Sequence, residues 1–508
     1  MKRLAIVLGI VMLASVAAFG TGTPQGSTAA DAPEVIVQLM SDAPPDVAMV
    51  TDAINELLLA RLNVTVKFQH LTWTDWQQNY RLLLASGAPV DVLYAANWND
   101  YAAYARNGAY LALDDLVAKA APDLFTAIPK SSWDGVKIGG SIYAVPPLRY
   151  GYSGSAHMLY REDLRKRYGI APITNVPTML AYFDAVKAND PSMYPVQERG
   201  DGWLGTYFTN LLAKGNPGSA WETGGGLTQS SLLWLDYRNP RTPLKAPWEL
   251  AQYGKFLQDM RSFAQKGYFG QDILAEVTIA PELLEAGKTG GVIGGGENVD
   301  KVQELIQRVT TNNPTWEIGD FSWDLANGFA IPSAAQQDLS TIPIQSKHPE
   351  EGLKVVQAML LDRDLQFLVD YGIEGVHYSI NDQNQYVQLP GAKGYAVFGM
   401  AAWAWKNQSL MLADGSVWGT EHDAYLKAFD GIAVANNGFA LDVDPIVAEL
   451  TACIQVEQQY GWPLWSGLVE NIAEGQRIFE QRLTEAGFAK GKAEVQKQFL
   501  AYLAEVGQ

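Results

Sequence analysis

Apolar residues recur with two different periods once the polar amino-terminal stretch ends. Short β-branched runs bounded by turn residues predict strands over 34–40, 64–68 and 90–94. Between these runs, apolar residues at helical spacing predict helices over 46–61 and 76–85. Strands that alternate with helices in this way are typical of a parallel sheet with crossover helices.

Polar and aromatic residues occupy the loops that follow these three strands. The loops contain Asp42, Trp73, Asn97 and Trp98. The carboxyl ends of parallel strands meet at one edge of a sheet, where ligands bind. We therefore expect these four residues to face a ligand. For Asn97 and Trp98 the alternative is a surface turn that caps the next helix.

Farther along the chain the pattern predicts a hairpin over 133–146, a strand over 156–160 and helices over 161–170 and 176–187. A segment rich in glycine and aromatic residues, 149–155, separates the hairpin from the strand. The two glycines of this segment allow the backbone to rotate more freely than other residues do.

Three side chains of this segment are candidate ligand contacts, namely Arg149, Tyr150 and Tyr152. A guanidinium group can donate several hydrogen bonds to hydroxyl groups or to a carboxylate. The alternative for Arg149 is a salt bridge that holds this segment in place.

The amino terminus has the pattern of an export signal. Lys2 and Arg3 precede an apolar run over 4–19, which is short for a helix that spans a bilayer. We predict a secretory signal peptide over 1–20 and a flexible polar tether over 21–32. A buried helix is the alternative, but such a helix rarely begins with two cations at the chain start.

Cleavage is expected after Gly20, with cleavage after Ala17 as the alternative. The chain has one cysteine, Cys453, which lies far from the apolar run in an apolar phrase of its own. We therefore expect neither a lipid-attachment cysteine nor a disulfide within the chain. Cys453 itself is expected to be a small buried side chain.

Charge and composition restrict the class of partner. The net charge of -18 opposes binding to nucleic acids and anionic membranes, because both need a cationic surface. The hydrophobic fraction of 48% excludes a disordered chain. The 15 tryptophans and 23 tyrosines are numerous, and not all of them need lie in the core. Aromatic faces suit the C–H faces of sugar rings, so we expect a carbohydrate ligand.

Catalytic and metal-binding motifs are missing from the sequence. It contains no HExxH metal motif, no GxSxG elbow, no phosphate-binding P-loop and no EF-hand loop. We therefore predict a protein that is not an enzyme and holds neither a metal nor a cofactor. A secreted glycoside hydrolase with paired carboxylates is the alternative, because carboxylates are plentiful. A cell-surface scaffold or adhesin is a third hypothesis.

Several phrases together resemble one protein family. The phrases lie at 108–116, 142–146, 159–170, 283–294 and 371–378. In this order and spacing the chain resembles the extracellular solute-binding proteins of the maltose-binding type. The run from Asp442 to the carboxyl terminus resembles the long last segment, of unknown function, in a lipoprotein-like subgroup. The resemblance covers nearly all of the chain after the signal peptide.

The resemblance implies an α/β fold of the periplasmic-binding-protein type, with two lobes joined by a hinge, a ligand cleft between them and an extra helical segment. One lobe would contain 33–148 and 321–361, and the other 149–320 and 362–508. The segment 149–155, with its two glycines, would then be the first crossing between the lobes and part of the hinge. The implied function is the substrate-binding component of an ABC import system that closes over its ligand. The partners would be a small molecule, expected to be a sugar, and the membrane subunits of the transporter. The chain would act as a monomer in the periplasm or outside the cell.

Further candidate residues lie in the expected second lobe. Trp203 stands in a glycine-rich loop, and Glu297 and Asn298 follow three glycines, which let backbone approach a ligand. A helix cap is the alternative for Asn298. Glu374 and Tyr378 belong to the most distinctive phrase of the resemblance, where holding a loop in place is the alternative role.

Three other tryptophans are assigned to packing. Trp234 lies within an apolar run, and Trp403 and Trp405 flank a single alanine. For these residues we expect burial in a core.

Overall fold

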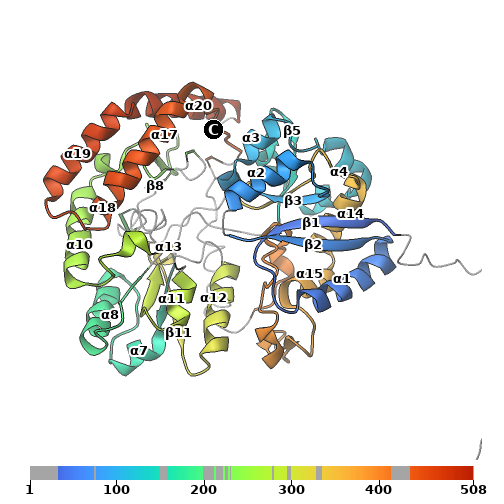
Figure 1. The fold of residues 1–508 in the computed structure, drawn as a ribbon, viewed down its shortest axis with the longest axis horizontal. Helices are drawn as coiled ribbons and strands as arrows, with labels where there is room; N and C mark the ends of the chain where they lie inside the picture. Colours follow the sequence, from blue (N-terminus) through green and yellow to red (C-terminus); the bar gives the residue numbers. More distant parts are fainter. Residues whose placement is uncertain are drawn as a thin grey trace, which may run out of the picture.

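The computed structural model describes two lobes that lie side by side (Figure 1). It describes residues 32–506 except for 74–75, 149–156, 198–210, 213–220, 224–226, 229, 277, 279, 294–298, 328–333, 414–434 and 437. Each lobe has its own sheet and its own hydrophobic core. No helix in the described part of the chain is both long enough and apolar enough to cross a membrane.

The first lobe is built on a five-stranded sheet with the order β2-β1-β3-β12-β6. Its strands are β1 (Glu34–Met40), β2 (Thr65–Leu71), β3 (Val92–Ala95), β6 (Ala144–Val145) and β12 (Leu339–Thr341). Strand β1 pairs in parallel with β2 and with β3, whereas β12 runs antiparallel to β3 and β6. The carboxyl ends of β1, β2 and β3 therefore lie at one edge, as the alternating pattern predicted.

Helices cover this sheet because their apolar faces pack against its buried side chains, such as Val35 and Val37 of β1. They are α1 (Val47–Leu62), α2 (Trp76–Ser86), α3 (Tyr101–Arg106), α4 (Asp114–Ala120), α5 (Asp123–Ala127), α6 (Lys130–Gly135), α14 (Pro349–Leu361) and α15 (Arg363–Tyr371). Two hairpins belong to the same lobe, β4 (Lys137–Ile138) with β5 (Ser141–Ile142), and β13 (Tyr378–Ile380) with β14 (Tyr386–Gln388).

The second lobe has an antiparallel sheet with the order β10-β7-β11. Its strands are β7 (His157–Arg161), β10 (Gly291–Ile293) and β11 (Ile318–Ser322), and a separate hairpin joins β8 (Trp221–Thr223) to β9 (Trp234–Asp236). The helices around them are α7 (Glu162–Arg167), α8 (Val176–Asn189), α10 (Tyr253–Lys266), α11 (Ala280–Glu285), α12 (Val299–Asn312) and α13 (Trp323–Asn327). Asn175 caps α8 by accepting a hydrogen bond from the Thr178 amide, which explains why that helix begins there.

The carboxyl-terminal helices form the outer wall of the second lobe (Figure 1). They are α17 (Val447–Val456), α18 (Trp462–Trp465), α19 (Ile472–Glu485) and α20 (Phe488–Glu505), with a π-helical turn, η9 (Glu457–Gly461), between the first two. Their buried residues join two cores of this lobe. Phe479 packs beside Trp465 in one, and Phe499 packs beside Phe439 in the other.

The packing divides the lobes differently from the sequence-based boundaries at 321 and 361. Phe321 packs in the core of the second lobe, whereas Leu365 and Tyr395 pack in the core of the first. The apolar pattern around these three residues predicts their local structure. It does not indicate which of the two lobes buries them. Residues 363–412 thus extend the first lobe.

A buried ion pair holds the end of this extension in place. Lys406 and Asp370 pair through their side chains, each of which is 1% exposed. The Lys406 ammonium group also lies over the ring of Phe398. The backbone around Lys406 bonds to Leu148, whose amide donates to the Lys406 carbonyl at 2.9 Å. The ion pair therefore fixes the segment around Lys406 beside Leu148. Leu148 is the last described residue before the expected hinge.

Lys406→Met should destabilise the protein by about 3–5 kcal/mol, because it leaves the buried Asp370 carboxylate without its ammonium partner. Urea unfolding of the purified chain measures this change. The matched control is Lys490→Ala, which removes a surface pair with Glu449 and should cost at most about 1 kcal/mol. Equal stability losses in the two variants would contradict the assignment of Lys406 as a structural anchor.

Candidate functional site

Four tryptophans gather at the carboxyl edge of the first sheet. We call Trp73, Trp76, Trp98 and Trp403 the tryptophan cluster. The ring of Trp73 lies 6.1 Å from Trp98 and 5.7 Å from Trp403, with interplanar angles of 30° and 34°. Trp76 meets Trp98 edge-on at 5.4 Å. The cluster therefore brings four indole rings together, with Trp73, Trp98 and Trp403 moderately tilted to one another and Trp76 edge-on.

Each member of the cluster comes from a different local structure. Trp73 follows β2 and is 40% exposed, and Trp76 begins α2. Trp98 lies in the turn η2 (Asn97–Asn99), directly after β3, and Trp403 begins the turn η6 (Trp403–Trp405). Parallel β2 and β3 place their ends at one edge, so the first three are brought together by the sheet.

Hydrogen bonds orient the buried sides of these rings. Trp98 Nε1 donates to the Gln337 carbonyl at 3.0 Å. Tyr94, buried beneath Trp98 and Trp403, donates its hydroxyl to Asp338 at 2.5 Å. Gln337 and Asp338 immediately precede β12. The short segment that leads into this strand therefore fixes the rings of Trp98 and Tyr94.

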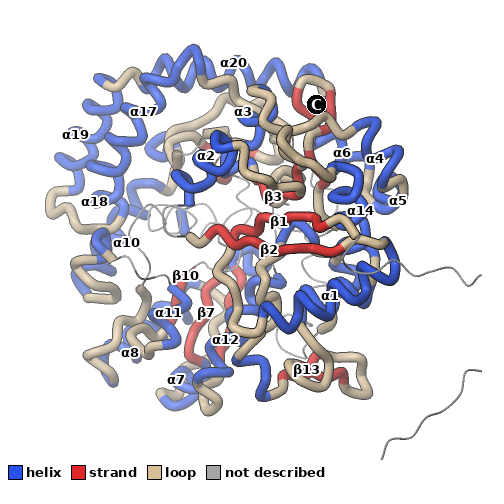
Figure 2. The backbone as a smooth tube through the Cα atoms, turned by 45° about the vertical axis from the view of Figure 1, so that its right-hand side comes forward, coloured by secondary structure: helices blue, strands red, loops and turns tan. Residues whose placement is uncertain are grey.

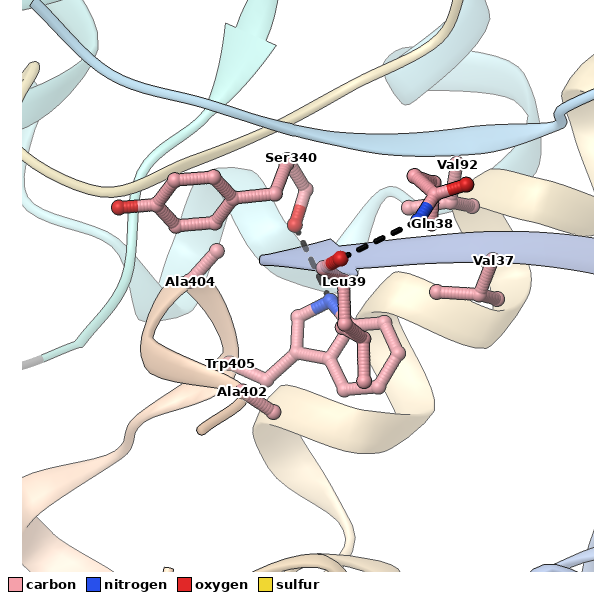
Figure 3. A pocket seen from close by; sticks show the side chains of 9 residues that line it. Val37, Gln38, Leu39, Val92, Ser340, Ala402, Ala404 and Trp405 are labelled. Atoms are coloured by element: carbon pink, nitrogen blue, oxygen red, sulfur yellow. Dashed lines mark hydrogen bonds between the residues drawn. The ribbon is translucent and has the colours of Figure 1, made fainter. Parts of the chain in front are cut away.

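Trp405 differs from Trp403 in being buried. Figure 3 shows its indole beneath β1, with Nε1 donating to the Ser340 hydroxyl at 3.0 Å. The cavity that it lines has a volume of only about 10 Å³, room for about one water molecule. Trp405 is thus a core residue, as the sequence predicted, and this cavity is a packing defect rather than a ligand site.

Polar groups surround the end of β1 beside the cluster. Asp42 is exposed, and the neighbouring Ser41 hydroxyl lies 3.0 Å from His70 Nδ1 and donates to the Met400 carbonyl. Burial lowers the pKa of His70, and the nearby Asp42 carboxylate opposes this shift only in part. At neutral pH this imidazole is therefore uncharged.

The structure brings some predicted site residues together and separates others. Trp73, Asn97 and Trp98 lie at the same sheet edge, and Asp42 follows β1 there. Arg149, Tyr150, Tyr152, Trp203, Glu297 and Asn298 lie outside the described residues.

Glu374 and Tyr378 lie in a different part of the first lobe. Figure 2 shows β13 at the lower edge, away from the ends of β1 and β3. Tyr378 is 3% exposed and stacks on Tyr386 at 5.9 Å in a separate aromatic core. Tyr378 therefore has a packing role, while Glu374 is exposed beside it.

Sequence reasoning missed two members of the cluster. Trp403 was assigned to packing, and Trp76 was considered only as the start of a helix. For Trp76 a signal existed, because Trp73 and Trp76 are three residues apart at a helix start, which favours neighbouring side chains. For Trp403 no local signal existed, since its neighbours come from distant segments.

Two buried titratable groups lie outside the cluster, on the carboxyl-terminal helices. Burial raises the pKa of the Cys453 thiol to about 11, so it is an inert core side chain, as expected. Burial also raises the pKa of Glu457 to about 7. The Glu457 carboxyl accepts a hydrogen bond from the Ser231 amide at 3.0 Å, which indicates a structural role. No group of side chains in the described ranges could hold a metal ion.

Two α/β lobes and an aromatic cluster at a carboxyl sheet edge define a two-lobed binding protein. The model of the bacterial extracellular solute-binding proteins matches residues 48–366, and the chain belongs to this family. A domain of unknown function matches residues 436–504. The resemblance and the fold class predicted from the sequence are thereby confirmed.

Curated and solved proteins agree with this assignment. A carbohydrate ABC transporter substrate-binding protein of Streptococcus pneumoniae serotype 4 is 21% identical over 516 residues, which cover 97% of this chain and 96% of that protein. Substrate-binding proteins of ABC transporters are not enzymes, and neither is this chain.

Two solved structures share the fold. The N-glycan transport solute-binding protein NgtS of Streptococcus pneumoniae, in complex with Man1GlcNAc, has a TM-score of 0.71 at 18% identity, covering 93% of this chain and 100% of that chain. A solute-binding protein of Bifidobacterium longum infantis, described as HMO-binding and associated with an ABC transporter, has a TM-score of 0.57 at 16% identity, covering 93% and 99%.

Glu457→Gln should make the protein more stable at pH 8 relative to wild type than at pH 4. The folded pKa of about 7 lies above the ordinary 4.5, so folded wild type holds its proton more tightly. Wild type therefore loses stability as pH rises between these values, on the order of 3 kcal/mol in total. The neutral amide avoids this loss.

Urea unfolding of both proteins at several pH values measures the difference. Glu494→Gln, at an exposed surface pair, is the control and should change stability by less than about 1 kcal/mol. A difference between wild type and Glu457→Gln that stays constant from pH 4 to pH 8 would contradict the prediction, because it would show that folding leaves the Glu457 pKa unchanged.

Proposed function

We propose that this protein is the extracytoplasmic substrate-binding component of an ABC import system and that it binds an oligosaccharide. The observation that carries the proposal is the tryptophan cluster, in which the ring of Trp73 is tilted by 30° and 34° against those of Trp98 and Trp403. Flat apolar rings pack well against the C–H faces of pyranose rings, and polar groups beside them can bind hydroxyl groups.

The extent of the cluster favours a ligand of more than one sugar unit. Trp73 is next to both Trp98 and Trp403, at centroid distances of 6.1 Å and 5.7 Å. A surface that spans three indole rings is wider than a single pyranose. The names of the relatives support the same ligand class, since they include carbohydrate, N-glycan and HMO binding.

Charge at the site favours neutral sugars. Asp42 is exposed at the same sheet edge, and His70 beside it is uncharged at neutral pH. A carboxylate in this position repels uronic acids and can accept hydrogen bonds from hydroxyl groups. Neutral oligosaccharides are therefore the preferred ligands in this proposal.

We infer that the ligand lies between the lobes and that binding closes them. The first lobe would contain 33–148 and 334–413, and the second 157–327 and 435–506, a division that follows the packing of the cores. Closure is favoured when the ligand binds the closed arrangement better than the open one. A ligand enclosed in this way is shielded from water, which strengthens its hydrogen bonds.

The partners follow from this function. The protein would be exported through the signal peptide predicted over 1–20 and would act as a monomer. It would deliver its ligand to the membrane subunits of the transporter. Its acidic net charge of -18 is consistent with a protein that stays off anionic membrane surfaces.

Titration calorimetry with neutral oligosaccharides, uronic-acid oligosaccharides, amino acids and peptides tests the ligand class. We expect binding to neutral oligosaccharides, tighter for disaccharides and longer chains than for monosaccharides. Chromatography of the incubated sugars should show them intact. Binding of amino acids or peptides in place of sugars would overturn the proposal.

Trp98→Ala and Trp403→Ala should each weaken binding of the best oligosaccharide at least tenfold, about 1.4 kcal/mol, because each removes one ring of the stacking surface. Phe125→Ala is the matched control, since this ring is 40% exposed on the first lobe but lies on α5, outside the cluster. Wild-type affinity in both tryptophan variants would remove the cluster from the site.

A further inference from the structure

A short stretch of the carboxyl-terminal segment touches both lobes. We call residues 438–442 the strap. On the side of the second lobe, Phe439 packs edge-on against Phe499 of α20 at 5.3 Å. Gln498 of α20 accepts a hydrogen bond from the Asp442 amide at 2.9 Å and donates one to the Asp442 carbonyl at 3.0 Å. These contacts fix the strap to the last helix of the chain.

The opposite side of the strap contacts the first lobe. Arg106, at the end of α3, donates a hydrogen bond to the Leu441 carbonyl at 3.0 Å. Ala440 packs against the core of the first lobe. Since α3 and α20 belong to different lobes, the strap connects the two through non-covalent contacts (Figure 1).

The backbone of the strap also approaches the first lobe at a glycine. Gly438 has a φ of +85°, and a Cβ atom there would lie 3.2 Å from the carbonyl oxygen of Gly135, which ends α6. Only a residue without a side chain fits this approach and this backbone conformation comfortably. The strap therefore packs backbone against backbone on the first lobe.

Gly135 also belongs to the support of the tryptophan cluster. Its carbonyl accepts a hydrogen bond from the Gln336 side chain at 2.9 Å. The Gln336 carbonyl accepts from the Asn97 amide, and the next carbonyl, of Gln337, accepts from Trp98 Nε1. A continuous set of contacts thus leads from the strap to Trp98.

We propose that the carboxyl-terminal helical segment is an interlobe brace: through the strap it limits how far the lobes separate and supports the loop that holds Trp98. The inference goes beyond the proposed function, because it assigns a role to a segment that matches a domain of unknown function. A contact that forms in one arrangement of the lobes stabilises that arrangement relative to others. Removing the strap contacts therefore favours more separated lobes.

Arg106→Ala removes the side-chain contact, and Gly438→Ala forces the strap away from Gly135. Small-angle X-ray scattering of the purified chain without added sugar should show a larger radius of gyration in both variants than in wild type. Hydrogen exchange should show faster exchange, at least about threefold, at the amides of residues 97–99. Arg106→Lys, which keeps a donor, should restore part of both changes.

Arg477→Ala is the matched control, because Arg477 is also exposed, but its hydrogen bonds to Glu474 and Gln481 stay within α19 and so within one lobe. It should leave the radius of gyration and the exchange rates at wild-type values. A wild-type radius of gyration and wild-type exchange in both Arg106→Ala and Gly438→Ala would overturn the brace. Neither measurement uses a sugar, so failure of the brace and failure of the proposed ligand class are distinguishable.

Discussion

The buried ion pair between Lys406 and Asp370 constrains the segment on which the candidate site depends. Two charges that are each 1% exposed are costly to remove from water, so they are retained only in a well-packed arrangement. The pair fixes residues 403–408 to α15 and, through Leu148, to the start of the expected hinge. Trp403 lies at the beginning of this segment. The position of Trp403 against Trp73 therefore depends on the Lys406–Asp370 ion pair and on the packing around it.

The tryptophan cluster shows how three distant parts of the chain produce one surface. Parallel pairing of β1 with β2 and β3 brings the loops after these strands to one edge. The approach to β12 orients Trp98 through the Gln337 carbonyl. The segment anchored by Lys406 adds Trp403. Because each ring is held by a separate structural element, the stacking surface is formed before any ligand arrives, which lowers the entropy cost of binding.

The sequence was most informative where periodicity and sheet rules act locally. The first three strands and two helices were predicted within a few residues, and the strand-end rule placed Trp73 and Trp98 at the sheet edge where the structure has them. It was least informative where tertiary contacts decide. Tyr378 belongs to a distinctive phrase, yet stacking on Tyr386 buries it. The amphipathic pattern of α15 predicts a helix but not the lobe that buries it, so the boundary at 361 could not be placed correctly.

The location of the cluster constrains the order of events in binding. All of its described members belong to the first lobe, so a sugar can stack there before the second lobe takes part. Closure then depends on the additional binding free energy from contacts with the second lobe. A ligand that binds both arrangements equally well does not shift the equilibrium between them. A brace that limits lobe separation lowers the entropy lost in closure. The strap and the tryptophan cluster therefore both act on the equilibrium between separated and closed lobes. The strap acts from outside the site, and the cluster acts from within it.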